Sequence, residues 1–459
     1  MSRTSPDDTI AALATPPGEG GIGIVRLSGD RAVAIVHSVF VSSRGRDIRT
    51  DARQIFHGEI RDKDVPVDEV LVHVMRAPYT YTREDVVEVN CHGGAGPLNA
   101  VLGLVLKAGG RLAGPGEFTQ RAFLNGRIDL VQAEAVIDRI RARTDAGLRA
   151  ASAASCGLLS KEIYQIRDAL LLAKSHIEAA IDFPDDDLPE LITPELRENV
   201  AAAHVRMDKL LETADAGRIL REGATVAIAG RPNVGKSSLF NAMLRESRAI
   251  VTAQPGTTRD VLEEVVSVEG IPLRLTDMAG LRETVDEVER IGVELARRAI
   301  AQSAMVLFMV DASEAAHRDD ISLLEELAEL GVPIILVPNK IDLGDVLDPG
   351  ELAYDFAAIS KMSALRGQGL PELEATLSDL LCGGVQLAPD QALLTRVHQK
   401  DSLRRAAEAV GRIEANFGNS PEFLSIDIDE ALRALGEITG ETTPDMVLEQ
   451  IFSSFCIGK

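Results

Sequence analysis

The chain has 459 residues, 45% of them hydrophobic and 26% charged, and 48 basic side chains stand against 71 acidic ones for a net charge of −23. This composition is typical of a folded globular protein and excludes a disordered one, and the length favours about three domains of roughly 150 residues. Aromatic residues make up only 3% and tryptophan is absent, which argues against a stacking platform for single-stranded nucleic acid.

Neither the apolar runs nor the cysteines indicate a membrane or an oxidising compartment. The longest apolar runs, such as 304–310, are too short to span a bilayer, and the N-terminus lacks a secretory signal pattern. The four cysteines lie far apart without C-x-x-C spacing, which favours free thiols over a zinc site. We therefore expect a cytoplasmic protein with no membrane contact.

In chain order, residues 1–125 predict a mixed α/β domain, because β-branched stretches alternate with Gly/Pro turns around one helix near 97–106. Residues 126–222 predict long helices with apolar positions three and four apart, and Thr193 followed by Pro194 predicts a capped helix start. Residues 223–384 alternate apolar strands with amphipathic helices, which predicts a mostly parallel sheet covered on both faces.

Residues 390–459 return to a helical pattern, so the α/β segment 223–384 is flanked by helices on both sides. The simplest arrangement is one helical domain, made of 126–222 and 385–459, into which the α/β domain is inserted. The strands expected in the insert are 224–229, 273–276, 305–310 and 333–337.

The acid excess is uneven along the chain. Residues 223–384 hold 14 basic and 26 acidic side chains, a net −12, whereas residues 1–125 are near neutral at −1. A nucleic-acid partner normally leaves a basic footprint. No segment shows one, so nucleic-acid binding would have to use a local patch or a second protein.

The strongest motif runs from Gly230 to Ser237 and fits G-x-x-x-x-G-K-S between a predicted strand and a predicted helix. Its glycines let the loop surround phosphates with backbone N–H groups, while Lys236 neutralises the β- and γ-phosphates and the Ser237 hydroxyl ligates Mg²⁺. We predict a nucleoside triphosphate site here.

A second motif, Asn339 to Asp342 (NKID), follows a predicted strand about a hundred residues later. Its aspartate can accept hydrogen bonds from N1–H and the exocyclic amine of guanine, a pair of donors that adenine lacks. Ser363 to Leu365 stands where guanine-binding proteins place a backbone contact to the base, with Leu365 in the place of the usual lysine. The base is therefore predicted to be guanine.

Between these motifs lies Asp277 to Gly280 (DMAG), whose aspartate can hold the metal through water and whose glycine can sense the γ-phosphate. A threonine in 256–260 (GTTRD) can complete the Mg²⁺ shell. Ras-like enzymes carry a water-orienting Gln after this motif, but here the residue is Leu281. Either an acid of 286–289 replaces it, or that run is simply a solvated helix face.

Five segments together resemble the MnmE family, also called TrmE, of tRNA-modification GTPases. They are 14–18 (ATPPG), 115–125 (PGEFTQRAFLN), 231–237 (RPNVGKS), 255–260 (PGTTRD) and 452–459 (FSSFCIGK). The resemblance covers essentially the whole chain. It implies an α/β multidomain protein with an α+β folate-binding and dimerisation domain (1–125), a split helical domain and an inserted Ras-like P-loop GTPase domain (223–384).

The resemblance also implies the reaction and the partners. Members hydrolyse GTP and, with the flavoprotein MnmG, add a carboxymethylaminomethyl group to C5 of the wobble uridine of certain tRNAs. The implied assembly is a homodimer that forms a heterotetramer with MnmG. A K⁺ ion supplies the positive charge that an arginine finger supplies elsewhere.

By position, the family implies a set of ligands and catalytic groups in the GTPase domain. Asn233, Thr252, Gln254 and Thr257 would ligate K⁺, Ser237 and Thr258 would ligate Mg²⁺, and Glu289 would position the attacking water. The residues expected to bind GTP are Asn233, Val234, Gly235, Lys236, Ser237, Ser238, Thr252, Ala253, Gln254, Pro255, Gly256, Thr257, Thr258, Asp277, Met278, Ala279, Gly280, Asn339, Lys340, Asp342, Ser363, Ala364 and Leu365.

The family further implies a 5-formyl-tetrahydrofolate or related one-carbon folate, bound at Arg26, Glu88, Arg127 and Lys459. Arg127 stands where some relatives carry lysine, and a planar guanidinium differs from a point charge, so the pose or affinity of the folate can differ. Cys456 is either a chemically important thiol or an inert structural cysteine, since its pKa decides between them.

Three other motifs are set aside. The glycines of 18–23 match G-x-G-x-x-G but precede their strand, so the dinucleotide interpretation fails on context. Cys91 and His92 are adjacent and would point to opposite faces of a strand, which argues against a catalytic dyad. The aspartates of 185–187 are better explained by a solvated helix break than by a metal site.

Two competing functions remain open from the sequence. The GTPase motifs alone also permit a ribosome-assembly GTPase that acts as a binding switch, although no RNA-binding module with a GXXG loop is evident. A folate-dependent one-carbon enzyme with a purely regulatory GTPase is the other alternative.

Overall fold

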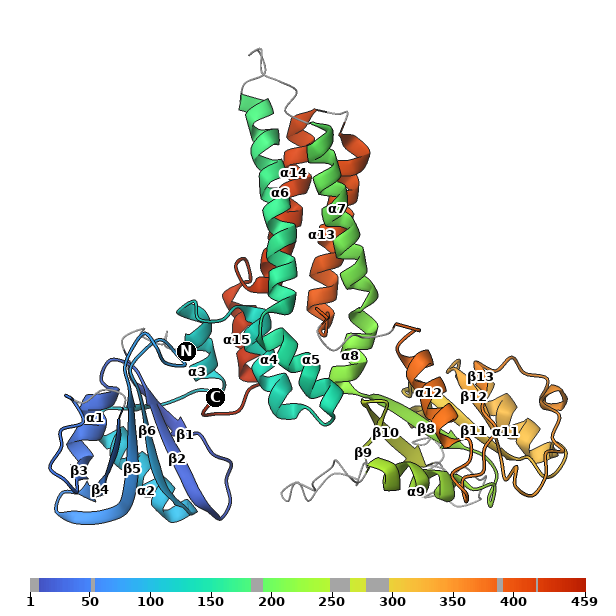
Figure 1. The fold of residues 1–459 in the computed structure, drawn as a ribbon, viewed down its shortest axis with the longest axis horizontal. Helices are drawn as coiled ribbons and strands as arrows, with labels where there is room; N and C mark the ends of the chain where they lie inside the picture. The colour runs from blue at the N-terminus through green and yellow to red at the C-terminus, as the bar shows by residue number, and fades with distance from the viewer. Residues whose placement is uncertain are drawn as a thin grey trace. The chain divides into compact units, whose positions relative to one another are not determined.

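The computed structural model describes residues 8–50, 54–182, 193–247, 265–277, 297–385, 391–417 and 420–459, and the chain divides into two compact units. The first unit comprises Met1–Ile137 and Gly436–Lys459, and the second comprises Asp138–Leu435. Each unit is described on its own (Figure 1).

The first unit is built on a seven-stranded sheet in the order β3-β4-β5-β6-β2-β1-β7. Neighbouring strands run antiparallel, apart from the parallel pair of β1 and β7. The strands are β1 (Ile10–Leu13), β2 (Gly20–Ser28), β3 (Phe40–Ser42), β4 (Ile55–Asp62), β5 (Val65–Met75), β6 (Val86–Gly93) and β7 (Arg111–Leu112), and the helices include α1 (Ala32–Val39), α2 (Ala95–Lys107), α3 (Glu117–Leu124) and α15 (Asp445–Ser453).

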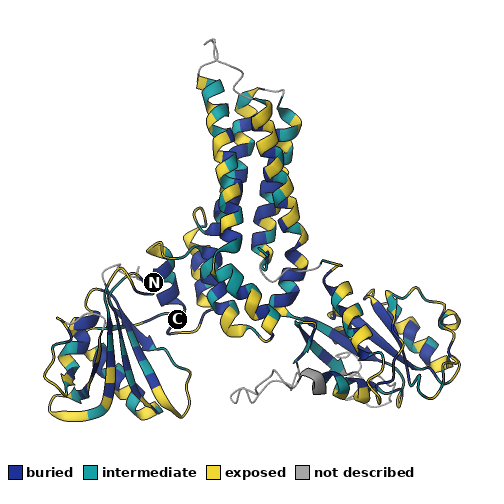
Figure 2. Cartoon of the chain, viewed as in Figure 1, coloured by how far each residue is buried: buried dark blue, intermediate teal, exposed yellow. Residues whose placement is uncertain are grey.

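One face of this sheet carries the core. Alternate strand residues such as Val72 and Val89 are fully buried against Val36 of α1 and Val101 of α2. The dark-blue positions on β5 and β6 in Figure 2 follow this alternation. Burial of every second side chain is the expected result of the two-residue period of a strand. The opposite face carries a smaller apolar cluster of Ile10, Ala12, Ala113 and Phe118 at its β1 end.

A buried ion network joins the start of the chain to α3. Arg121, whose side chain is only 9% exposed, contacts the carboxylates of Asp8, Glu84 and Glu117, and Arg111 contacts Asp8 and Glu117. Burial alone would raise the pKa of the Asp8 and Glu117 carboxyls, but their bonds to these arginines outweigh it and lower both pKa values. The network fixes β1 and β7 against α3.

Replacing Arg121 with Met leaves these carboxylates without their central cation. We expect the first unit to lose about 3–5 kcal/mol of unfolding free energy at pH 7, because one partner of a buried ionic network is removed. Chemical denaturation followed by circular dichroism measures this loss. The matched control Arg61→Met removes a half-exposed arginine that pairs with Glu59, and we expect a cost below about 1 kcal/mol.

The same network predicts a pH dependence. Because the carboxyl pKa values are lower in the folded protein than in the unfolded chain, the stabilisation is present above about pH 4 and is lost as the pH falls further. The Arg121→Met variant should therefore lose less stability than the natural protein between about pH 5 and pH 3. An equal loss in both proteins would show that the network does not govern acid sensitivity.

The second unit contains long helices and a second sheet. Its helical elements outside the sheet region are α5 (Asp145–Ser155), α6 (Leu158–Asp182), α7 (Pro194–Glu212), α8 (Ala214–Glu222) and α13 (Val397–Asn416), while α4 (Leu130–Arg141) and α14 (Pro421–Thr439) contribute their parts within 138–435. Thr193 accepts a hydrogen bond from Leu196 N at 3.1 Å with Pro194 at the first turn, so the predicted capped start of α7 is confirmed.

Polar contacts connect these helices along their length. His204 of α7 lies 2.7 Å from Glu414 of α13, and Lys174 of α6 lies 2.6 Å from Asp429 of α14. Apolar residues at three- and four-residue spacing, such as Ile163, Ile166 and Leu170, are fully buried. The periodic pattern of 126–222 therefore predicts the helical elements correctly.

The second sheet has the order β13-β12-β11-β8-β10-β9 and is parallel except for β9, which runs antiparallel to β10. Its elements are β8 (Ala224–Ala229), α9 (Lys236–Ser247), β9 (Val265–Val268), β10 (Ile271–Asp277), β11 (Met305–Asp311), α11 (Arg318–Ala328), β12 (Ile334–Asn339), η1 (Pro349–Leu352), β13 (Ala358–Ile359) and α12 (Leu370–Leu381).

Both faces of this sheet are buried, as the alternation of strands and helices predicts. Val226 and Ile228 of β8 pack with Leu239 of α9 on one face, whereas Ala227 and Ala229 pack with Leu324 of α11 on the other. This doubly covered parallel sheet confirms the predicted fold class.

The helical pattern predicted for 390–459 does not reach the C-terminal end of the chain. Helix α15 ends at Ser453, and in the tail that follows Ile457 makes an isolated bridge with Pro115. Gly458 at φ 95° and the bridge hold the backbone of this tail outside the helical region.

Candidate functional site

The carboxyl ends of the parallel strands in the second sheet form one edge. The loop 230–235 follows β8, and β10, β11 and β12 end at Asp277, Asp311 and Asn339. Ligands of open parallel sheets bind outside these strand ends. The motifs predicted from the sequence therefore converge on one edge of one sheet.

The phosphate loop is a tight turn closed by its lysine. Lys236 Nζ donates to the carbonyl oxygens of Gly230 and Arg231 at 2.7 and 2.8 Å, and the side chain is only 9% exposed. Gly235 has φ 107°, and a Cβ there would lie 2.1 Å from Asn339 Nδ2. A larger residue at 235 would separate the loop from β12, so the final glycine of the motif is required for packing.

Asn339 joins the phosphate loop to the loop after β13. Its Nδ2 donates to the Val234 carbonyl at 2.7 Å, its Oδ1 accepts from Ala364 N at 2.9 Å, and the residue is 2% exposed. Both polar ends of the amide are thus satisfied inside the protein. Asn339 holds the phosphate-binding and base-binding segments in one arrangement.

Asp342 is fixed beside the predicted base contact. Its carboxylate accepts from Ser363 Oγ at 2.7 Å and lies 3.2 Å from Arg366 Nε, with 7% of the side chain exposed. A carboxylate held in this way can receive the paired donors of guanine without reorganising. Leu365, which stands in the place of the usual lysine, is 84% exposed and lies outside the core.

Lys340 has φ 68° and its Nζ lies 2.6 Å from Asp311 Oδ2. Burial alone would raise the pKa of the Asp311 carboxyl, but the hydrogen bonds from Lys340 and Ser313 and the charge of Lys340 together outweigh it and lower that pKa. Asp311, at the end of β11, therefore holds the Lys340 side chain in place beside the nucleotide site. No sequence motif marked Asp311, since its only signal was its place at the end of a buried strand.

Several predicted residues lie outside the described residues. They are Thr252, Ala253, Gln254, Pro255, Gly256, Thr257, Thr258, Met278, Ala279, Gly280, Leu281, Glu289 and the aspartates of 185–187. Asp277 is described as the last backbone position of β10, beside Ile228 of β8. Asn233, at φ 69°, Ser237 and Ser238 are exposed at the loop and at the start of α9.

The described part of the nucleotide site contains one of the predicted Mg²⁺ ligands, Ser237. Ser237 is exposed at the N-terminal turn of α9, which directs backbone N–H groups toward anions. Among the described residues, no group of three or more His, Cys, Asp or Glu side chains could hold a metal ion.

A second candidate site lies in the first unit, on the sheet face opposite the main core. Arg26 of β2 donates from Nε to Glu88 Oε1 of the neighbouring β6 at 2.8 Å and from Nη1 to the Gly458 carbonyl at 3.2 Å. Its guanidinium also lies 5.8 Å from the ring centroid of Phe118. Glu88, Phe118 and Gly458, which surround Arg26, come from distant parts of the sequence.

The C-terminal tail is part of this site. Gly458 has φ 95°, and a Cβ there would lie 2.0 Å from the Leu13 carbonyl oxygen, so only glycine fits. Gly116 N donates to the Cys456 carbonyl at 3.3 Å. Lys459 N donates to the same carbonyl at 3.4 Å, and the Cys456 side chain is exposed. The tail is held by its backbone, which leaves the thiol accessible.

The contacts of Arg127 are made with Tyr81 and not with the Arg26–Glu88 pair. Its Cζ stands 4.7 Å from the Tyr81 ring centroid, and its Nη1 donates to the Tyr81 carbonyl at 3.3 Å. Tyr81 OH in turn lies 3.0 Å from Thr119 Oγ1. Tyr81 and Phe118 are aromatic faces beside predicted folate residues, and sequence analysis missed both.

Cys91 and His92 behave as their positions on a strand predict. Cys91 is buried, and burial raises the pKa of its thiol to about 12, whereas His92 is exposed and its Nδ1 lies 2.6 Å from Asp68 Oδ1. The hydrogen bond to Asp68 raises the pKa of His92. A catalytic pair of these two residues is excluded by their opposite faces.

The glycines of 18–23 also fail as a dinucleotide loop, but not for the reason given by the sequence. They follow β1 and run into β2, with which β1 forms an antiparallel pair. A dinucleotide loop instead opens a helix in a βαβ unit. The expectation that no strand precedes them is wrong.

Comparison with known proteins shows the family. A model of the TrmE N-terminus, described as that of a GTP-binding protein, matches residues 9–127, and a model of the MnmE helical domain matches residues 130–456. The curated tRNA modification GTPase MnmE of Enterococcus faecalis is 47% identical over 468 residues and covers 100% of both chains. The chain belongs to the MnmE family of tRNA modification GTPases.

A second MnmE, from Alkaliphilus oremlandii, is 44% identical over 460 residues and covers 99% of each chain. The resemblance to MnmE drawn from the motifs and the prediction that the chain is a GTPase are therefore confirmed. Membership in MnmE also favours tRNA modification over the ribosome-assembly alternative.

Solved structures are similar to part of the chain. Aquifex aeolicus Era bound to GDP·AlF4⁻ is 26% identical, with 40% of this chain and 66% of that chain covered and a TM-score of 0.28. The G domain of the T. maritima FeoB iron transporter is 28% identical, with 34% and 97% covered and a TM-score of 0.26. In the described part of the chain, no helix combines the length and apolar content needed to cross a membrane.

Proposed function

We propose that the chain is a K⁺-stimulated GTP hydrolase that works with the flavoprotein MnmG. Together they would add a carboxymethylaminomethyl group to C5 of the wobble uridine, position 34, of certain tRNAs. The observation that carries the proposal is the likeness to MnmE over the whole chain, which includes both units and the C-terminal tail. The assembled phosphate loop and the fixed Asp342 support the GTPase half of it.

The proposed nucleotide site comprises the phosphate loop, Asn339, Lys340 and Asp342, and the loop of Ser363 to Leu365, with the residues of 252–258 and 277–280. Ser237 and Thr258 would ligate Mg²⁺. The satisfied amide of Asn339 and the hydrogen bond from Ser363 to Asp342 support this assignment, since both fix the loops before any nucleotide binds.

K⁺ would be held by Asn233, Thr252, Gln254 and Thr257, and Glu289 would position the attacking water. Asn233 is exposed in the phosphate loop, where its side chain can reach a cation beside the phosphates. A positive charge there stabilises the transition state in the role of an arginine finger. Equal GTP turnover in Na⁺ and K⁺ would contradict the ion, and undiminished turnover in Glu289→Ala would contradict the glutamate.

The proposed folate site consists of Arg26, Glu88, Arg127 and Lys459. The paired charges of Arg26 and Glu88, with Phe118 beneath the guanidinium, suit a planar ring that carries donors and acceptors. The ligand would be 5-formyl-tetrahydrofolate or a related one-carbon folate. Unchanged folate affinity in Glu88→Ala would contradict this placement.

For the architecture, we propose an N-terminal domain of residues 1–125, a helical domain of 126–222 with 385–459, and a GTPase domain of 223–384. The helical-domain model matches residues 130–456, a range that begins before and ends after the GTPase segment, and this supports the insertion. We further propose a cytoplasmic homodimer that assembles with MnmG into a heterotetramer and acts on tRNA.

The function is tested by nucleoside analysis of tRNA from cells that lack this protein. We expect the C5-modified wobble uridine to disappear and to return when the natural chain is supplied. Supply of a Lys236→Ala chain is the matched control, because it removes the phosphate-loop cation and should not restore the nucleoside. Unchanged wobble uridines in the deletion strain would overturn the proposal.

A further inference from the structure

The side chain of Arg231 connects the phosphate loop to the segment between β11 and α11. Its Nε donates to Asp320 Oδ1 at 2.8 Å, and its Nη2 donates to Glu314 Oε1 at 2.6 Å. The Arg231 side chain is 18% exposed and that of Asp320 only 2%, whereas Glu314 is half exposed. The pair with Asp320 is therefore the buried part of this contact, and the pair with Glu314 is the solvated part.

Asp320 holds Arg231 at a fixed point of the fold. It is the third residue of α11, and its Oδ2 accepts from His317 N at 3.4 Å in the capping box that begins the helix. Leu324 of the same helix is buried in the core of the second sheet. Ion pairs between exposed side chains contribute little to stability, but removal of one partner of a buried pair leaves an uncompensated charge. The Arg231 guanidinium is therefore held by an element that is itself packed.

The main chain of Arg231 holds the lysine of the phosphate loop. Lys236 Nζ donates to the Arg231 carbonyl oxygen at 2.8 Å and to that of Gly230 at 2.7 Å. Lys236 is the side chain predicted to neutralise the β- and γ-phosphates. Arg231 thus contacts Asp320 through its side chain and Lys236 through its carbonyl, so the position of one affects the position of the other.

The phosphate loop needs such contacts because its backbone is not regular. Gly230, Asn233 and Gly235 have φ values of 149°, 69° and 107°. A positive φ is unfavourable for a residue other than glycine, such as Asn233, and it persists only where the surroundings fix the chain. Asn339 fixes the end of the loop through the Val234 carbonyl. The side chain of Arg231 is the corresponding contact at its beginning.

The segment that receives Arg231 also contacts the base-binding motif. Asp311 accepts from Ser313 N at 3.0 Å and from Lys340 Nζ at 2.6 Å. Glu314, the next residue after Ser313, pairs with Arg231. Residues 311–320 therefore contact the guanine-binding motif at one end and the phosphate loop at the other.

We propose that Arg231 is a positioning residue for GTP hydrolysis and that its pair with Asp320 sets the place of the Lys236 ammonium against the phosphates. The inference rests on the proposed function for its nucleotide. Only GTP has a γ-phosphate, so an ammonium group that moves should weaken triphosphate binding more than diphosphate binding. A role in stability alone would change both affinities by the same factor.

The test measures the affinity of the full chain for GDP and for GDPNP, a slowly hydrolysed GTP analogue, together with kcat and KM for GTP. For Arg231→Met we expect the ratio of GDPNP to GDP affinity to fall about ten-fold, because one charge-assisted contact to the γ-phosphate is weakened. We expect kcat to fall about ten-fold or more and KM to change less, since a small misplacement costs most in the transition state. Arg231→Lys keeps the charge without the fork and should recover part of both losses.

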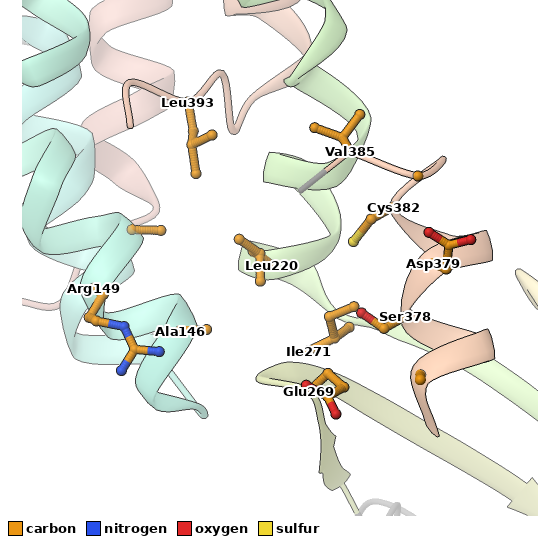
Figure 3. A pocket seen from close by; sticks show the side chains of 13 residues that line it. Ala146, Arg149, Leu220, Glu269, Ile271, Ser378, Asp379, Cys382, Val385 and Leu393 are labelled. Atoms are coloured by element: carbon orange, nitrogen blue, oxygen red, sulfur yellow. The ribbon is translucent and has the colours of Figure 1, made fainter. Parts of the chain in front are cut away.

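Two arginines that are exposed elsewhere in the second unit serve as matched controls. Arg318 is the first residue of α11, two positions before Asp320. Arg149 lines a separate recess of about 510 Å³, together with Glu269 and Cys382 (Figure 3). The described residues that line this recess do not include a residue of the nucleotide motifs. Arg318→Met and Arg149→Met should leave the affinity ratio and kcat within about two-fold of the natural values.

A double variant tests the pair and protects the experiment against misfolding. Arg231→Met leaves the buried Asp320 without its guanidinium, whereas R231M/D320N removes both charges. If the two residues act as one pair, the double variant should lower the affinity ratio by no more than Arg231→Met or Asp320→Asn does alone. Losses that multiply in the double variant would show independent effects and would overturn the pair.

An unchanged affinity ratio in Arg231→Met, or in R231M/D320N where the single variant does not fold, would overturn the proposal. Equal falls in GDP and GDPNP affinity would also overturn it, because they indicate a structural role only. Failure of the proposed function gives a different result, since the natural chain would then bind neither GDP nor GDPNP.

Discussion

Asp342→Asn is expected to lower GTP affinity by about 10²–10⁴-fold and to create affinity for xanthosine triphosphate, XTP. Two charge-assisted hydrogen bonds to guanine are worth about 1.5–3 kcal/mol each, and every 1.4 kcal/mol is ten-fold in affinity. The new amide would direct an N–H group at the guanine amine, which cannot accept. Xanthine carries a carbonyl at that carbon, and a carbonyl accepts from the amide.

The structure makes this test sharp because the carboxylate is already fixed. Ser363 Oγ at 2.7 Å and Arg366 Nε at 3.2 Å hold Asp342, and an Asn side chain is of nearly equal size. Fluorescent GTP and XTP analogues measure both affinities. Asp345→Asn is the matched control, because that carboxylate is half exposed and pairs with Lys361. A loss of GTP affinity without any gain for XTP would contradict base recognition by Asp342.

The parallel sheet could be predicted closely from the sequence. The runs at 224–229, 305–310 and 333–337 coincide with β8, β11 and β12 to within a residue or two. These strands are buried on both faces, so their sequences are continuously apolar and separated by turn residues. The nucleotide motifs follow them directly, and their convergence at one edge follows from the parallel arrangement.

Short edge strands and long-range contacts could not be predicted. β3, β7 and β13 have three, two and two residues, too few for a periodic pattern. The network around Arg121 joins residues 8, 84, 111 and 117, which no local signal connects. The bridge of Pro115 with Ile457 spans almost the whole chain. Such pairings depend on tertiary packing rather than on local propensity.

Net charge summed by segment does not show how charged side chains cluster after folding. Summed by segment, the chain has no basic region, and this left a local patch or a second protein as the two routes to nucleic-acid contact. A recess in the second unit nevertheless has Arg141, Arg143, Arg221, Arg274 and Arg396 among its lining residues. Folding brings these positions together from separate segments, so no stretch of sequence shows the cluster.

Asn339→Ala should weaken GTP and XTP equally, because this residue joins two loops instead of selecting the base. The change leaves the Val234 carbonyl and the Ala364 N–H without their partner at a position that is 2% exposed. Each unpaired buried group costs about 1–3 kcal/mol. We expect nucleotide affinity to fall by about 10–100-fold, since part of that cost is borne by the free protein as well.

The readout that separates positioning from recognition is the affinity ratio. In the Asp342→Asn background, adding Asn339→Ala should lower XTP affinity by the same factor that it lowers GTP affinity in the natural chain. Asn241→Ala, an exposed asparagine on α9, is the matched control and should change stability by less than about 0.5 kcal/mol. Asn339 bonds both the phosphate loop and the loop after β13, so its loss should affect every nucleotide. A fall in GTP affinity without a fall in XTP affinity would assign Asn339 to base recognition and contradict its role as the link between the loops.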